Sequence, residues 1–184
     1  MTRDCYFQMR QICKIRKYLS QTAIEKLCHA FITSRLDSLN SLLFKIPKYL
    51  LHKLQLVQNS TARIILKLKK HDHSTPALYK LHWLPIDERI QYKILLLVFK
   101  ALVGESPKYM QDIIQVYQPS KALRSKFKRL LVETIITSKY GKRAFASGGP
   151  ALFNKLPEDL RKSKTVSSFK SKLKTHLFKK YYKV

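Results

Sequence analysis

Apolar residues recur at steps of three and four along most of the chain, which is the period of helices that bury one face. The first such stretch covers residues 3–19 and carries apolar side chains at Cys5, Met9, Ile12 and Cys13. This spacing predicts an amphipathic helix with one apolar side. The basic residues expected on its outer side are Arg10, Lys14, Arg16 and Lys17.

Two further helices are predicted in the first part of the chain. Ser20 is placed to cap the earlier one, whose apolar positions run through Ala23, Leu27, Phe31 and Ile32. The chain then stays apolar to a stop at Ile46-Pro47. The later helix is expected over roughly 47–67, where an apolar face repeats at Leu50, Leu54, Val57, Thr61 and Ile65.

The clearest helix signal begins at Pro85. Asp87 and Glu88 follow in the first turn, where the helix dipole favours acids, and Gly104 stands where a C-cap belongs. Residues 94–99 are apolar on every side, which predicts that this helix lies in the middle of the core. Ser106-Pro107 then predicts the start of a short helix.

The last third of the sequence has a different pattern. The β-branched run from Val132 to Thr137 predicts an extended or β segment, and Gly148-Gly149-Pro150 predicts a break. Thr165 is placed to cap a final helix. The apolar positions of that helix are Val166, Phe169, Leu173, Leu177 and Tyr181, among many lysines.

Together these elements predict a mainly α protein, an irregular multi-helix bundle with a small extended or β segment near 130–138 and a basic C-terminal helix. We expect a helical core region over 1–118 and a basic C-terminal region over 119–184. The residues expected in the core include Leu27, Phe31, Leu54, Trp83, Leu96 and Phe99.

Charge points to a class of partner. The chain has 37 Lys and Arg against 11 Asp and Glu, a net charge of +26, which exceeds what solubility requires and favours binding to a polyanion. Residues 121–184 hold most of the excess, with 18 basic and 3 acidic residues. Nucleic acid, either RNA or DNA, is the expected partner. The basic last helix would also suit an anionic membrane surface or a calmodulin-like groove.

The stretch KKHDHSTPALYKLHWLPIDER at residues 69–89 concentrates three histidines and the only tryptophan. His71, Asp72 and His73 are metal-ligand types, but no cysteine lies near them and the spacing does not supply a full zinc ligand set. A joint between two helices is the favoured interpretation, with Thr75 capping a short helix and Trp83 packed under the next one. No metal site is expected.

Patterns typical of catalysis are missing from the sequence. It contains no nucleophile elbow, no phosphate-binding P-loop and no carboxylate cluster suited to metal-dependent nucleotidyl transfer, so neither enzymatic activity nor a cofactor is expected. No apolar run is long enough to span a membrane and no signal core follows Met1, which predicts an intracellular protein of the nucleus or cytoplasm. Cys5, Cys13 and Cys28 are interpreted as buried thiols.

Several strings of the sequence are longer than amphipathicity alone explains. HAFITSRLDSLN at 29–40, LQLVQNSTAR at 54–63 and LHWLPIDERIQYKILLLVFKAL at 81–102 are the strongest, and YQPSKALRS, YGKRAFASGGPALFNKLPEDLR and FKSKLKTHLF follow in order. With them the chain resembles the C-terminal region, thumb and post-thumb, of a LINE-type non-LTR retrotransposon reverse transcriptase of the jockey group. Ser38-Leu39 and Phe153 depart from the pattern of that family.

The resemblance implies a fragment that lacks the catalytic palm of an RNA-directed DNA polymerase and retains nucleic-acid binding. Its first helices would correspond to a thumb that holds the template-primer duplex, and its tail would add contacts to element RNA or target DNA. On that frame the candidate contacts are Arg10, Lys14, Arg16, Lys17, Lys48, Lys53, Arg63, Lys126, Lys128, Arg129, Lys170, Lys172 and Lys174.

Two other functions stay open at the level of sequence. The chain could be a host-recruited protein-interaction or scaffold module whose basic surface meets acidic partners, or a metal-dependent enzyme. We also expect self-association, because helices that would pack on a missing palm leave apolar faces exposed.

Overall fold

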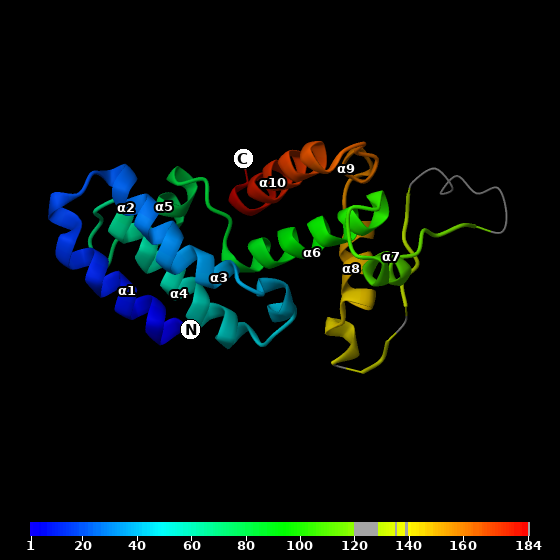
Figure 1. The fold of residues 1–184 in the computed structure, drawn as a ribbon, viewed down its shortest axis with the longest axis horizontal. Helices are drawn as coiled ribbons and strands as arrows, with labels where there is room; N and C mark the ends of the chain where they lie inside the picture. The colour runs from blue at the N-terminus through cyan, green and yellow to red at the C-terminus, as the bar shows by residue number, and fades with distance from the viewer. Residues whose placement is uncertain (120–128, 135, 139, 184) are drawn as a thin grey trace. The chain divides into compact units, whose positions relative to one another are not determined.

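The computed structural model describes residues 1–119, 129–134, 136–138 and 140–183. Throughout these residues the fold is mainly helical, as predicted (Figure 1). The chain divides into two compact units, unit 1 at residues 1–90 and unit 2 at residues 91–184. The division falls inside helix α6 (Ile86–Val103).

Unit 1 opens with the predicted amphipathic helix, α1 (Thr2–Ile15), which continues into a 3₁₀ turn at Arg16–Tyr18. Its buried residues are Cys5, Met9 and Ile12, and it packs on α4 (Lys48–Ile65). Ser20 caps α2 (Gln21–Cys28) as expected, because its hydroxyl accepts a hydrogen bond from the Ala23 amide at 3.3 Å.

The segment after α2 differs from the prediction. A π-helical turn occupies His29–Thr33 and leads into α3 (Ser34–Asp37). The buried face consists of Ile24, Cys28, Ile32 and Leu36. A face that repeats every four residues drifts around a regular α-helix, and the wider π turn offsets that drift.

Two core expectations fall on this segment. The expectation that Phe31 lies in the core is wrong, because its side chain is 44% exposed. Leu27 is half-buried. Leu27 and Phe31 directly precede the buried Cys28 and Ile32, so the sequence contains two overlapping apolar faces. The tertiary contacts bury the face that contains Cys28 and Ile32.

Helix α4 and the following joint close unit 1. Leu54, Val57, Thr61 and Ile65 are buried on α4 at the spacing predicted, whereas Leu50, the first residue of the predicted face, is exposed. Helix α5 (Ser74–Lys80) packs beside α4. Thr75 lies inside α5, whose N-cap is His73, so the predicted Thr75 cap is wrong.

Two glutamines of α4 hold the joint after α5. The buried Gln58 donates from Nε2 to the Leu84 carbonyl at 2.9 Å, and Gln55 Oε1 accepts from the Ile86 amide at 2.9 Å. These bonds satisfy a backbone carbonyl just before α6 and the amide of its first residue, and Trp83 is buried next to this joint. The 69–89 stretch is therefore a packed helix joint in this structure.

Unit 2 is built around three phenylalanines. Phe99 of α6 and Phe169 of α10 (Val166–Tyr182) stack with ring centroids 4.1 Å apart, and Phe153 of α8 (Phe145–Asn154) lies 6.3 Å from Phe169. All three side chains are fully buried, whereas Leu96 is half-buried. Thr165 caps α10 as predicted, since its hydroxyl accepts from the Ser168 amide at 3.2 Å.

The predicted break at Gly148-Gly149-Pro150 is wrong. These residues lie inside α8 and are buried. A Cβ atom at Gly149 would come 2.8 Å from Cγ2 of Val98, so the glycine is needed for close packing of α8 on α6. The Gly-Gly-Pro sequence, which usually indicates a turn, is present here because two helices pack closely at Gly149.

The extended segment is shorter than predicted. An isolated antiparallel bridge joins Val116 to Leu131, with the Tyr117 amide bonded to the Leu130 carbonyl at 2.8 Å and the Val132 amide to the Gln115 carbonyl at 2.9 Å. No strand forms among the described residues of 130–138, and Ile135 lies outside them. Two short helices complete unit 2, α7 (Lys108–Ile113) and α9 (Glu158–Arg161).

Candidate nucleic-acid interface

One face of α1 carries a row of cations. Arg3, Arg10 and Lys14 are spaced by seven and four residues, and Phe7 stands between the first two, so all four project from the same side of the helix. Each is exposed, Phe7 to 50%. Within the described part of the chain none of the three cations forms an ion pair. We call these four residues the α1 row.

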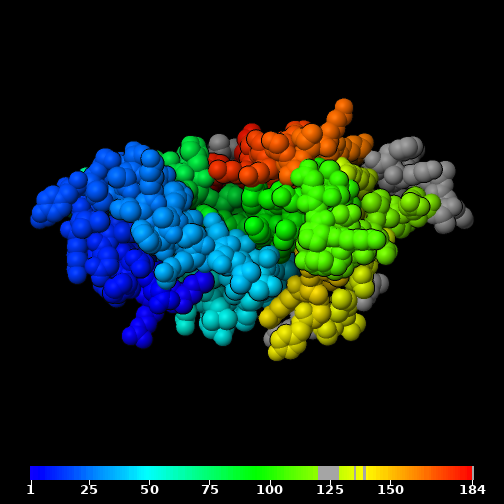
Figure 2. Space-filling view, viewed as in Figure 1, coloured from blue at the N-terminus to red at the C-terminus, as the bar shows by residue number. Residues whose placement is uncertain are grey.

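The α1 row stays uncovered because the opposite face of the helix is buried. Met9 lies in the packing with α4, where the Thr61 hydroxyl approaches its sulfur at 3.7 Å. That contact turns the row outward, and Figure 2 shows α1 in dark blue at the surface of unit 1. The exposed cations remain free to meet phosphates at little cost in desolvation.

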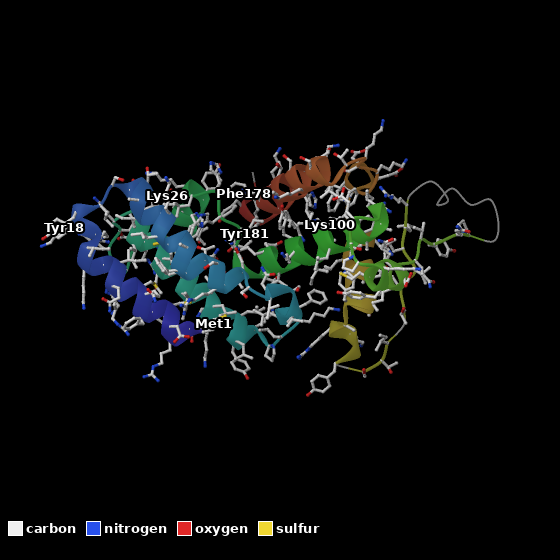
Figure 3. The ribbon with its side chains drawn as sticks, in the orientation of Figure 1. Met1, Tyr18, Lys26, Lys100, Phe178 and Tyr181 are labelled. Atoms are coloured by element: carbon white, nitrogen blue, oxygen red, sulfur yellow. The ribbon has the colours of Figure 1, made fainter. Side chains whose placement is uncertain are left out.

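The turn after α1 extends this surface with an aromatic side chain. Lys17 Nζ lies 4.8 Å from the ring centroid of Tyr18, and Tyr18 is 77% exposed. Figure 3 shows Tyr18 projecting away from the ribbon. An exposed ring beside a cation is suited to stacking on an unpaired base. Arg16 is half-buried and is not part of the row.

The predicted contacts on α4 do not form a second row. Lys48 and Lys53 are exposed, but five residues place them about 140° apart around the helix. Arg63 has a structural contact, because its Nε donates to the Asp72 carbonyl at 2.9 Å and ties the loop after α4 to the helix. Asp72 also accepts from the Lys69 amide at 2.7 Å.

In unit 2 the lysines of α10 form two rows. Lys170 and Lys174 are one turn apart on one edge of the exposed face, and Lys172 and Lys179 are about two turns apart on the other. Phe169, Leu173 and Leu177 fill the buried face between these edges. Phosphates could therefore approach α10 from either side.

Aromatic residues gather at the end of α10. The Phe178 and Tyr182 rings lie 4.5 Å apart, and the Tyr181 ring meets that of Tyr182 edge-on at 4.9 Å; Figure 3 labels Phe178 and Tyr181 on this stretch. Burial, followed by the neighbouring Tyr181, raises the pKa of Tyr182 to about 12. A tyrosine with its ordinary pKa of 10 is already neutral at physiological pH, so this shift does not change the charge at the end of α10.

The remaining predicted contacts lie near the end of the basic segment 121–129. Lys126 and Lys128 lie outside the described residues. Arg129 is described and is engaged internally: its Nη1 donates to the carbonyls of Arg161 at 3.0 Å and Ser163 at 3.1 Å. These contacts use the guanidinium to hold two segments of unit 2, so Arg129 is a structural residue.

No metal centre is visible in the described part of the chain, where no group of three or more His, Cys, Asp or Glu side chains could hold an ion. Cys5 and Cys28 are fully buried and Cys13 is exposed, so the expectation that all three are buried is wrong for Cys13. Burial raises the pKa of the Cys28 thiol to about 12, with a smaller contribution from Cys13. A thiol with such a pKa is a poor nucleophile.

The sequence-based candidates did not include Arg3 and Phe7, which share the exposed face of α1 with Arg10 and Lys14. The available signal was their spacing from Arg10 and Lys14, which places all four on one helical face. None of the described helices is both long and apolar enough to cross a membrane. The chain matches no family model, no curated protein and no solved structure.

Proposed function

We propose that the chain is a non-catalytic nucleic-acid-binding segment, akin to the C-terminal region of a LINE-type reverse transcriptase. It binds RNA or DNA through the sugar-phosphate backbone. The observation that carries this proposal is the α1 row, where an exposed phenylalanine and three cations that form no ion pair among the described residues share one helical face. The lysine rows of α10 add a second cationic surface.

Charge and geometry together support binding without sequence preference. Lysines and arginines on a helix surface contact phosphates, which are the same for every sequence. The exposed rings of Phe7 and Tyr18 can stack on any base. The resemblance of strings such as LHWLPIDERIQYKILLLVFKAL to that family supports a role for these helices beside a template-primer duplex.

A salt titration of the full chain tests the proposal. Labelled duplex DNA and single-stranded RNA are titrated with protein at increasing KCl, and binding is followed by fluorescence anisotropy. We expect the logarithm of the binding constant to fall linearly with the logarithm of salt, by about 0.9 per neutralised phosphate on duplex and about 0.7 on single strands. Affinity that is insensitive to salt would contradict the proposal.

A further inference from the structure

We propose that unit 1 has a second binding surface, a cleft that accepts a protein segment with a bulky apolar side chain next to a carboxylate. The cleft has a volume of about 510 Å³ and lies between the start of α1 and the chain that follows α3. Met1, which Figure 3 labels at the start of α1, is one of the residues that line it. Its lining is Met1, Asp4, Arg35, Ser38, Leu39, Leu42 and Leu43.

The apolar part of the cleft is open to solvent. Leu39 is 72% exposed and Leu42 is 74% exposed, although the sequence places them in an apolar run that predicts burial. Two exposed leucines that line the same cleft form the kind of apolar patch at which a partner side chain gains free energy by burial.

The backbone conformation of Leu39 also supports a binding role for this residue. Leu39 has φ 54° and ψ 24°, in the left-handed region where glycine and asparagine are favoured and a bulky residue is rare. Its carbonyl accepts from the Leu42 amide at 3.0 Å, which fixes the turn. Folding gains little from a leucine that is both strained and exposed, so a contact outside unit 1 accounts better for its presence.

Charge selects the chemistry of the occupant. Arg35 lines the cleft and has no ion-pair partner within the described part of the chain. The nearby acids are already engaged: Asp37 accepts from Arg89 Nε at 2.8 Å, and Asp4 lies 3.2 Å from the Met1 amino group. A carboxylate on the partner could form an ion pair with Arg35 while the partner's apolar side chain packs on Leu39 and Leu42.

A second copy of the chain is a less favourable occupant. Unit 1 carries 16 Lys and Arg against 6 Asp and Glu, so two copies repel each other while an acidic segment is attracted. A nucleic acid would supply the negative charge but no aliphatic group for Leu39 and Leu42. An acidic amphipathic protein segment satisfies both parts of the cleft.

Selection from a displayed library of random dodecapeptides on the full chain tests this inference. Excess single-stranded RNA is present throughout, so that phosphate-binding surfaces are occupied. We expect enrichment of peptides that combine a large apolar residue with Asp or Glu close by. Binding of the enriched peptides, measured by anisotropy, should weaken at least about tenfold in Leu42→Ala and in Arg35→Glu.

Two variants separate binding from folding and from general charge. Leu39→Gly removes the side chain and relieves the left-handed backbone, so its thermal midpoint should equal or exceed that of the native chain while peptide binding is lost. Lys80→Glu makes the same change of charge at an exposed position outside both the cleft and the α1 row, and should leave peptide affinity within about twofold.

Each other outcome overturns the inference. No enrichment, or enriched peptides that bind Leu42→Ala and Arg35→Glu as well as the native chain, removes the cleft as a binding site. Enrichment of such peptides only when the RNA is left out assigns the surface to nucleic acid. A dimer in sedimentation that Leu42→Ala dissociates assigns it to a second copy. These results do not depend on the salt titration, so the nucleic-acid proposal stands or fails separately.

Discussion

The guanidinium carbon of Arg129 lies 5.4 Å from the ring centroid of Phe99. Phe99 is fully buried and stacks on Phe169, so Arg129 is fixed against the aromatic core of unit 2. The same guanidinium binds two backbone carbonyls. A residue that the sequence presents as one more phosphate contact thereby serves as an internal clamp.

Replacement of Arg129 should affect stability more than binding. We expect Arg129→Ala to lower the free energy of unfolding of unit 2 by about 2 kcal/mol, because two charge-assisted hydrogen bonds and the ring contact are lost. Hydrogen exchange of α10 amides measures this change. The salt dependence of RNA binding should stay the same; a slope reduced as much as by loss of an α1 cation would place Arg129 in the interface.

Neutralising the α1 row should weaken nucleic-acid binding. The triple variant Arg3→Gln, Arg10→Gln, Lys14→Gln should reduce the slope of log affinity against log salt on duplex DNA by about 2.7 if each cation meets one phosphate. The matched control is Lys67→Gln, Lys69→Gln, Lys80→Gln, which removes the same charge from exposed positions outside the row. Equal losses in both triples would show that only net charge matters.

Phe7 should distinguish single strands from duplexes. Its ring is exposed within the α1 row, where it can stack on an unpaired base but has no partner in a closed duplex. We expect Phe7→Ala to weaken single-stranded RNA binding by about 1–3 kcal/mol and to leave duplex DNA binding nearly unchanged. Phe7→Trp should retain the single-strand affinity. Equal effects of Phe7→Ala on both substrates would argue against stacking.

Gly149→Ala should destabilise unit 2 despite the better helix propensity of alanine. The new methyl group meets Val98 Cγ2 at 2.8 Å, and Val98 is fully buried and stiff. We expect a net loss of about 1–2 kcal/mol, since overpacking outweighs the helix gain. Val98→Ala in the same chain makes room and should recover part of the loss. A double-mutant cycle of Gly149→Ala and Val98→Ala, measured by thermal unfolding, should therefore show a coupling energy between the two positions. Strictly additive effects would contradict this contact.

The buried Cys28 thiol should make stability depend on alkaline pH. Its pKa rises from 9.0 to about 12 in the folded chain because of burial. The contribution of the neutral Cys28 thiol to the free energy of unfolding is therefore fully present below pH 9. It is lost as the pH rises from 9 toward 12, because in that range the thiol ionises only in the unfolded state. Between about pH 8 and pH 10.5 the native chain should lose about 2 kcal/mol more than Cys28→Ala.

Thiol labelling provides an independent check on the same residue. In the native chain at neutral pH we expect a maleimide to modify the exposed Cys13 alone, because Cys5 and Cys28 are fully buried. Both buried thiols should react after denaturation. Rapid modification of Cys28 without unfolding would contradict its burial and the pH dependence that follows from it.

The sequence alone determined most of the helices and several of their ends. The caps at Ser20 and Thr165 and the left-handed Gly104 involve residues only a few positions apart, so local hydrogen bonding and side-chain geometry are sufficient to predict them. The exposed lysines of α10 and the cations of α1 could likewise be placed by helical period, although Arg3 and Phe7 were overlooked.

Only the tertiary structure decided which candidates remain available for function. Whether Ile32 or Phe31 is buried, whether Gly149 breaks a helix or packs against Val98, and whether Arg63 and Arg129 meet phosphates or carbonyls all depend on partners distant in sequence. The exposure of Leu39 and Leu42 has the same origin. Helical period reports which residues share a face, but the burial of that face depends on what the rest of the chain brings against it.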